Sequence, residues 1–247
     1  MFRSSSLRCR RDHTWLSALF SSLILSACQT PQPSVDRPTT ISHVPATEAP
    51  ATAPGKRYIV DPQASEIRLL VYRDGPMARF GHNHAIVGRM HGNIAAGGSG
   101  AATARSFHIE VPVESFEVDL PGVRAEEGGE FAAEVSDAAR NGTKANMLGA
   151  DVLDAAHHPL IRIESVALVG PRWNSDVTAR VSLRGTTREL KFAAAAFQGA
   201  DALTVIAAFR IRQSEFGIAP FSILGGAVRV RDAIDVRVRL VARTAPQ

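Results

Sequence analysis

Hydrophobic and polar residues alternate over most of the chain that follows Lys56. The alternation is clearest over residues 67–71, 107–113, 177–183, 203–211 and 236–240, where every second side chain is apolar. A period of two places successive side chains on opposite faces of a strand, so each stretch predicts a strand with one apolar face and one solvated face. Short connections without alternating helices favour an antiparallel all-β architecture: a meander, a barrel or a sandwich.

One segment, between Glu126 and His158, departs from this period. It is rich in Ala, Glu and Asp and carries apolar residues at near-helical spacing: Met147, Leu148, Val152 and Leu153. This spacing predicts one or two short helices that end before Pro159. The adjacent acids Glu126 and Glu127 indicate a solvated helix start, since carboxylates are favoured at helix N-termini.

The composition excludes several classes of protein. A chain of 247 residues with 45% hydrophobic residues can bury a core, which excludes disorder throughout. The net charge is +4, but four arginines and one aspartate lie in the first 27 residues, which leaves 24 basic and 23 acidic side chains in the remainder. That balance argues against a nucleic-acid partner. Two cysteines exclude a disulfide framework.

The first 27 residues have the order of a bacterial export signal. Arginines precede an apolar run, 15–25, which is too short to span a bilayer comfortably. The four residues that end in Cys28, Leu-Ser-Ala-Cys, resemble a lipobox, whose cysteine is lipidated and becomes the mature N-terminus. We therefore expect residues 1–27 to be a signal peptide and Cys28 to carry a lipid anchor; ordinary cleavage near Ala27 is the alternative. Gln29 favours the outer membrane, since retention in the inner membrane usually places Asp there, so we expect an exported periplasmic protein.

Residues 28–55 contain six prolines among Ser, Thr and Ala. Proline at this density blocks both helices and strand ladders, so the segment is expected to be an extended, disordered linker between the anchor and the folded domain. The remaining alternating region, residues 56–244, has the size of one domain.

Several segments of this domain, in order, resemble the YceI-like family of bacterial periplasmic proteins. They are 58–61 (Tyr-Ile-Val-Asp), the glycine-containing stretch 81–94, Asn-Met-Leu at 146–148, Leu-Asp-Ala at 153–155, 158–165 (His-Pro-Leu-Ile-Arg-Ile-Glu-Ser), 183–187 (Leu-Arg-Gly-Thr-Thr) and 215–218 (Glu-Phe-Gly-Ile). The resemblance implies an extended lipocalin-like antiparallel β-barrel of about eight strands, whose lumen holds a long-chain polyisoprenoid or similar lipid. It implies no catalytic residues, and members of this family often form homodimers.

The residues are compatible with such a lumen. An eight-stranded barrel either fills with side chains or encloses one small ligand, and the inward positions here are rich in Ala and Val. The expected ligand-contacting residues are apolar or histidine: His82, His84, Met90, Phe107, Met147, Leu148, Phe192, Phe197, Phe209 and Phe216. For any one apolar member of this set, ordinary core packing is the commoner explanation, because apolar strand positions are usually just packed.

His82 and His84 lie two residues apart, so in an extended segment both rings project from one face. Two imidazoles on one face begin a zinc, copper or haem site, but a zinc site needs a third protein ligand. His91, His157 and His158 are the candidates, although His91 has the wrong parity unless a bulge intervenes. Hydrogen bonding at the barrel mouth, or contact with a ligand headgroup, is the interpretation we favour for the pair.

The sequence lacks the motifs of nucleophilic catalysis and of phosphate binding: there is no Gly-x-Ser-x-Gly turn and no phosphate-binding glycine loop. We therefore expect a binding protein rather than an enzyme, with no cofactor other than a bound isoprenoid-type lipid. The expected ligand is a polyisoprenoid, an isoprenoid quinone or a similar lipid. A periplasmic metal- or haem-binding protein that uses His82 and His84 is the alternative, and a metal-assisted enzyme is a weaker third.

Overall fold

The computed structural model describes residues 55–97 and 105–245 of the chain. The predicted signal peptide (1–27), Cys28 and residues 29–54 of the predicted linker lie outside the described residues. The described strands are β1 (Lys56–Val60), β2 (Glu66–Asp74), β3 (His84–Gly88), β4 (His91–Ala96), β5 (Ser106–Pro112), β6 (Glu117–Val118), β7 (Leu160–Val169), β8 (Ser175–Leu183), β9 (Thr186–Gln198), β10 (Ala202–Arg212), β11 (Ser222–Ile223) and β12 (Val228–Thr244).

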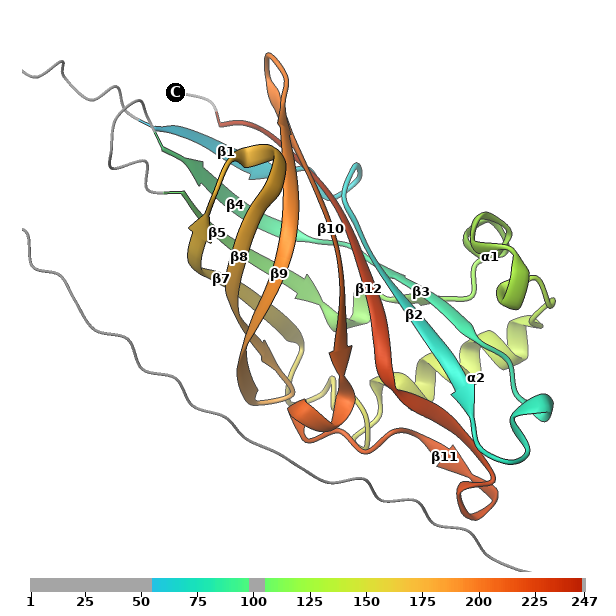
Figure 1. Ribbon diagram of the computed structural model, residues 1–247. Coiled ribbons are helices and arrows are strands. Elements are labelled where there is room, and N and C mark those ends of the chain that lie inside the picture. Colours follow the sequence, from blue (N-terminus) through green and yellow to red (C-terminus); the bar gives the residue numbers. More distant parts are fainter. Residues whose placement is uncertain (1–54, 98–104, 246–247) are drawn as a thin grey trace, which may run out of the picture. The chain divides into compact units, whose positions relative to one another are not determined.

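Eight of these strands form a closed ring. They pair in the order β1, β4, β5, β7, β8, β9, β10 and β12, and β1 pairs back with β12 through Tyr58 opposite Thr244 (Figure 1). Every pairing in the ring is antiparallel. The predicted all-β class and the antiparallel barrel of about eight strands are confirmed.

Beyond this ring, the sheet continues through β2, β3 and β6. β12 pairs with β1 near its C-terminal end and with β2 over Arg229–Arg239, β2 pairs with β3, and β3 pairs with β6. β1 and β2 therefore act as two halves of one strand, separated by a turn at residues 61–65. β4 and β3 are arranged in the same way along the neighbouring edge.

The period-two pattern matches the two faces of the barrel wall. In β8, four alternate residues are buried: Val177, Ala179, Val181 and Leu183. The intervening Arg180 is exposed on the outer face, opposite Glu189 of β9. This alternation places the apolar residues inside the ring and so builds the core there. Tyr58, Phe116 and Phe216 are among its fully buried side chains.

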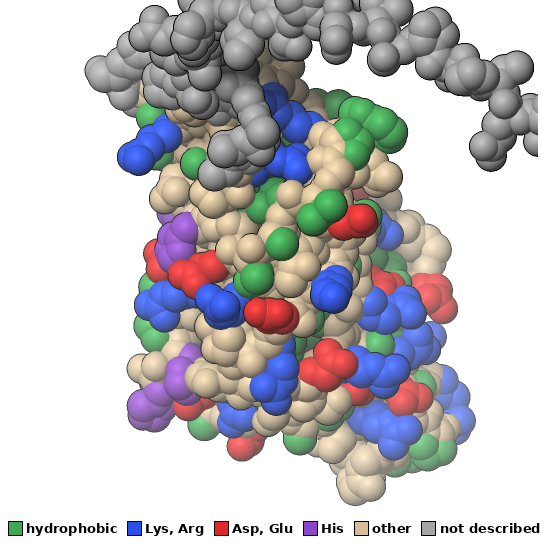
Figure 2. All heavy atoms as spheres, turned by 60° about the vertical axis from the view of Figure 1, so that its left-hand side comes forward, with side chains coloured by type: hydrophobic (Ala, Val, Ile, Leu, Met, Phe, Trp, Pro, Cys, Tyr) green, Lys and Arg blue, Asp and Glu red, His purple; other side chains and the backbone are tan. Residues whose placement is uncertain are grey.

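Positive and negative side chains are interleaved on the barrel face that Figure 2 shows. Ion pairs across strands are part of the outer surface: Arg162 of β7 lies 3.2 Å from Glu110 of β5. Exposed pairs of this kind contribute little to stability. They do keep the outer face of the wall solvated, which leaves the interior as the apolar side.

Two α-helices, α1 (Pro121–Glu127) and α2 (Asp137–Leu148), lie on the side of the sheet formed by β2 and β3 (Figure 1). Ser136 begins α2, because its side chain accepts a hydrogen bond from the Ala139 N–H. Met147 near the end of α2 is buried in the core. α2 lies in the segment predicted to be helical, whereas α1 begins before it. Neither helix, within the described residues, combines the length and hydrophobicity that crossing a membrane requires.

Glu126 and Glu127 do not begin a helix, so that prediction is wrong. They end α1, and the Glu127 side chain is only 7% exposed. Arg68 of β2 and Arg237 of β12 donate hydrogen bonds to it at 2.7 and 2.8 Å. The two guanidinium groups provide the compensation that a carboxylate at a helix C-terminus needs. Glu127 thereby ties α1 to the outer wall of the barrel.

Candidate functional site

A cavity of about 210 Å³, the larger cavity, lies inside the barrel wall next to α2. Residues of seven strands line it: β2 (Ile67, Leu69 and Val71), β3, β7, β8, β9, β10 and β12. All its lining residues are apolar except four, which are His84, Thr143, Asn146 and Gln213. An apolar wall with a few polar groups is typical of a ligand site.

A second cavity of about 130 Å³, the smaller cavity, lies further along the same lumen. The two cavities share Ile163, Phe192 and Phe209 in their walls. The rings of Phe192 and Phe209 stack with centroids 4.4 Å apart and planes 18° apart. This aromatic pair therefore stands where the two cavities meet, and together they form one narrow apolar lumen.

Seven of the ten residues predicted to contact ligand line these cavities. Met90 and Phe107 line the smaller one, His84, Met147 and Phe216 line the larger one, and Phe192 and Phe209 line both. His82 and Leu148 do not line either cavity; Leu148 is half-buried against the core. The structure thus places most of the set around one lumen, and their contact with a ligand stays a prediction.

Phe197 was wrongly placed among the lumen residues. It is 55% exposed on the outer face of β9. Phe192 and Phe197 are five residues apart in one strand, and an odd spacing puts two side chains on opposite faces. Ala194 and Ala196, which share the parity of Phe192, line the smaller cavity instead.

The pattern of apolar residues did not identify the polar side chains of α2 that line the larger cavity. Thr143, Asn146 and Met147 line the larger cavity, at the i, i+3 and i+4 spacing of one helix face. A search for helical spacing that admitted polar residues would have found the first two. They supply hydroxyl and amide groups to a wall that is otherwise almost wholly apolar.

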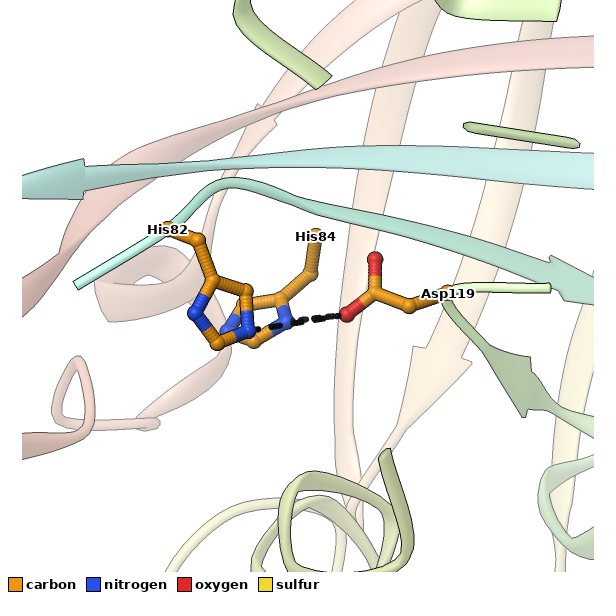
Figure 3. A group of neighbouring side chains, drawn as sticks. All are labelled: His82, His84 and Asp119. Atoms are coloured by element: carbon orange, nitrogen blue, oxygen red, sulfur yellow. Dashed lines mark hydrogen bonds and ion pairs between the residues drawn. The ribbon is translucent and has the colours of Figure 1, made fainter. Parts of the chain in front are cut away.

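His82 and His84 do lie side by side, and Asp119 lies against them (Figure 3). Their ring centroids are 4.6 Å apart. His84 begins β3, His82 precedes that strand, and Asp119 directly follows β6, which pairs with β3. His84 Nδ1 is 2.7 Å from Asp119 Oδ2, and His82 Nε2 is 3.9 Å from the same oxygen. We call these three residues the His–Asp cluster.

Asp119 is fully buried and held by three further hydrogen bonds. Its Oδ1 accepts from the Ala85 N–H at 2.9 Å and from Arg124 Nη1 at 2.5 Å, and its own N–H donates to the Ala85 carbonyl. Burial alone raises the pKa of Asp119, but the hydrogen bonds from His84, Ala85 and Arg124 outweigh it and hold the pKa below its ordinary value. Asp119 is therefore an ionised carboxylate of fixed orientation.

Burial and the neighbouring His84 lower the pKa of His82, which favours its neutral form. The other candidate histidines lie elsewhere. His91 is exposed on β4, opposite Glu110 of β5, and His157 is exposed and bonded to Asp154. The ring of His158 lies against Gly185. None of these three candidates joins His82 and His84 among the described residues, where the third group beside them is Asp119.

The closed antiparallel barrel and its apolar lumen define the class: a lipocalin-like barrel with apolar cavities inside it. Within this class the chain belongs to the YceI-like family, because the model of the YceI-like domain matches residues 58–242. No curated protein sequence matches the chain.

Solved structures are similar to the chain at low sequence identity. One is a polyisoprenoid binding domain from Saccharophagus degradans implicated in plant cell wall breakdown, 11% identical, with a TM-score of 0.50 over 76% of this chain and 98% of that one. Burkholderia cenocepacia BcnA is 16% identical, with a TM-score of 0.49 over 74% of this chain and 98% of that one. The Campylobacter jejuni YceI protein is 10% identical, with a TM-score of 0.44 over 64% and 82%.

Proposed function

We propose that this protein binds a long-chain apolar molecule, a polyisoprenoid, an isoprenoid quinone or a similar lipid, in the lumen of its barrel. The observation that carries the proposal is the lumen itself, two apolar cavities in line that share the walls at Ile163, Phe192 and Phe209. Membership of the YceI-like family and the polyisoprenoid binding of the Saccharophagus degradans domain support the same ligand class.

The shape of the lumen favours a linear ligand over a compact one. Each cavity alone is smaller than most sites for drug-sized molecules. A flexible chain that passes the aromatic pair would fill both and replace water against apolar walls, which favours binding in proportion to the area buried. The polar groups of Thr143, Asn146 and Gln213 offer contacts for a single polar end.

We infer a binding role rather than a catalytic one. Most side chains in the wall of the lumen are hydrocarbon, and such side chains can pack against a ligand and exclude water but cannot transfer protons. The sequence motifs of nucleophilic catalysis are also lacking.

We further propose that the protein is exported and held at the outer membrane by a lipid on Cys28, with residues 29–55 as a spacer. The arginine-rich start, the apolar run and the Leu-Ser-Ala-Cys segment support this. An anchored barrel on a flexible spacer would stay close to a source of its apolar ligand.

The lumen is tested by Ala207→Trp, with Ala208→Trp as its matched control. Ala207 is buried and lines the smaller cavity, whereas Ala208 is exposed on the outer face of the same strand. An indole at 207 fills ligand volume, so we expect mass spectrometry of the purified protein to detect less bound lipid, with the fold retained. In a solid core it would overpack instead and cost about 1–3 kcal/mol. Loss of stability with no lipid in the parent protein would contradict the proposal; Ala208→Trp is expected to retain lipid.

The anchor is tested separately by Cys28→Ser. Without a thiol to acylate, the variant is expected to lose fatty-acid labelling and to remain unprocessed or soluble. Retained acyl labelling and unchanged processing would refute the anchor but leave the binding proposal standing.

A further inference from the structure

We propose that the His–Asp cluster binds a first-row divalent transition-metal ion such as Zn²⁺. A ring nitrogen of His82, a ring nitrogen of His84 and an oxygen of Asp119 all lie within 4.8 Å of one another (Figure 3). Two imidazoles and one carboxylate are donors that zinc and its neighbours accept, whereas Mg²⁺ and Ca²⁺ prefer oxygen donors. The proposal does not depend on which molecule fills the lumen.

The separations are close to those of a bound set. Donor atoms around a tetrahedral zinc ion lie about 3.3 Å apart. Asp119 Oδ2 is 2.7 Å from His84 Nδ1 and 3.9 Å from His82 Nε2, so the two distances bracket that value. Asp119 Oδ2 therefore lies near the separation of a bound set from both ring nitrogens. The proton of His84 then resides on Nε2, which leaves Nδ1 as a donor to the metal.

The two carboxylate oxygens of Asp119 have different hydrogen-bond partners. Oδ1 is occupied by the Ala85 N–H and by Arg124, while Oδ2 faces the two histidines. Metal-binding carboxylates are commonly oriented in this way by hydrogen bonds to the oxygen that does not bind. Arg124 is itself buried and also donates to the Asn83 and Ala133 carbonyls, so its position is fixed. Its charge weakens the attraction for a cation but keeps Asp119 ionised.

The environment of His82 supports a metal ion independently of the distances between the three residues. Its Nε2 atom is buried and has no hydrogen-bond partner among the described residues. A buried polar atom without a partner is costly, and native structures rarely retain one without a reason. An ion between this nitrogen and Asp119 Oδ2 would satisfy it.

Three protein ligands leave one position of a tetrahedral metal for water or for an oxygen of another molecule. His84 also belongs to the wall of the larger cavity. A metal ion at the cluster would therefore sit beside the lumen, where it can meet the polar end of a bound chain.

The test is calorimetric titration of the full-length protein, stripped with a chelator, with Zn²⁺ alone. We expect one ion per chain, and we expect His82→Gln and His84→Gln each to weaken binding by more than about 100-fold, since even outer hydrogen-bond partners of a metal site are worth 10–100-fold. His91→Gln, at an exposed histidine outside the cluster, is the matched control and should bind as the parent does.

A second measurement separates lost binding from lost folding. Zn²⁺ should raise the Tm of the parent and of His91→Gln, because a ligand that binds only the folded state stabilises it, and should leave the Tm of His82→Gln unchanged. Absence of binding to the folded parent would overturn the proposal. Full affinity in both cluster variants, or an equal loss in His91→Gln, would also overturn it.

Discussion

Asp61 holds the turn between β1 and β2 with its side chain. It accepts hydrogen bonds from the N–H groups of Gln63 and Ala64, and from Arg243 Nε of β12 at 2.9 Å. The hydrogen bond from Arg243, above all, lowers the pKa of Asp61 below 3.8. Because the folded-state pKa lies below the unfolded-state pKa, this contribution is present above pH 3.8 and is lost as the pH falls through the folded-state value.

We expect Asp61→Asn to reduce the sensitivity of the protein to acid. The urea concentration at the midpoint of unfolding should fall more for the parent than for the variant between about pH 6 and about pH 3, since the variant has no carboxylate to protonate at this position. Asp151→Asn, at an exposed aspartate, serves as the control. Identical midpoint shifts in the parent and in Asp61→Asn would contradict this account.

The face of the barrel wall on which a single side chain lies was predictable wherever its position in an alternating strand alone decides it. Phe107 and Phe209 continue an alternating strand, and both line the lumen. Phe197 is an odd number of residues from Phe192 in the same strand, so it lies on the outer face of the barrel. Asp119 was not predictable, since 35 residues separate it from His84 and only the pairing of β3 with β6 brings them together. No local pattern contains that contact.

Among the elements, α1 is the helix whose start the sequence did not indicate. It has seven residues, which is too short for amphipathic periodicity to be visible, and its stability comes from tertiary contacts. Arg68 and Arg237 reach it from two strands that are far apart in the sequence. The longer α2 ends at Met147 and Leu148, two of the apolar residues whose spacing indicated a helix in this segment.

We expect Glu127→Gln to lower the free energy of unfolding by about 2 kcal/mol, because the change removes charge from the hydrogen bonds that two arginines donate to a nearly buried side chain. The neighbouring Glu126 side chain is 66% exposed and contacts only Arg68 among these arginines. Glu126→Gln should therefore cost less than about 1 kcal/mol. Urea denaturation of both variants measures the difference, and equal costs would show that Glu127 does not fasten α1.

At the scale of the whole molecule, the stacked pair Phe192 and Phe209 divides the lumen. Phe209→Ala should join the larger and smaller cavities. We expect a cost near 3 kcal/mol, at the low end for Phe→Ala, because the ring borders empty space on two sides. If the lumen holds lipid, the variant should also retain longer or bulkier chains, which mass spectrometry of the bound lipid measures.

Phe197→Ala is the matched control for this change. Its ring lies on the outer face of the barrel, so stability should change by less than about 0.5 kcal/mol and the bound lipid should stay the same. A Phe209→Ala protein with the same lipid distribution as the parent would mean that the aromatic pair does not limit the ligand.

The barrel class followed from the alternation along the strands together with the family resemblance. Alternation alone left open a meander, a barrel or a sandwich, because it specifies the face of each side chain but not which strand lies next to which. The pairing that decides between them joins Tyr58 to Thr244, at opposite ends of the domain. Contacts of that separation leave no periodic signal.

The dependence of the ring on β12 has a consequence for how the protein is made. β7, β8, β9 and β10 pair with their sequence neighbours and can form hairpins early in folding. β1 and β2 can pair with the nearby β4 and β3, but the pairings of both with β12 must wait until that strand, through Thr244, is available. Until then the apolar inner face stays open to water and to other chains, the condition in which nascent β-proteins aggregate and recruit chaperones. The lumen thus comes into existence in a single late step.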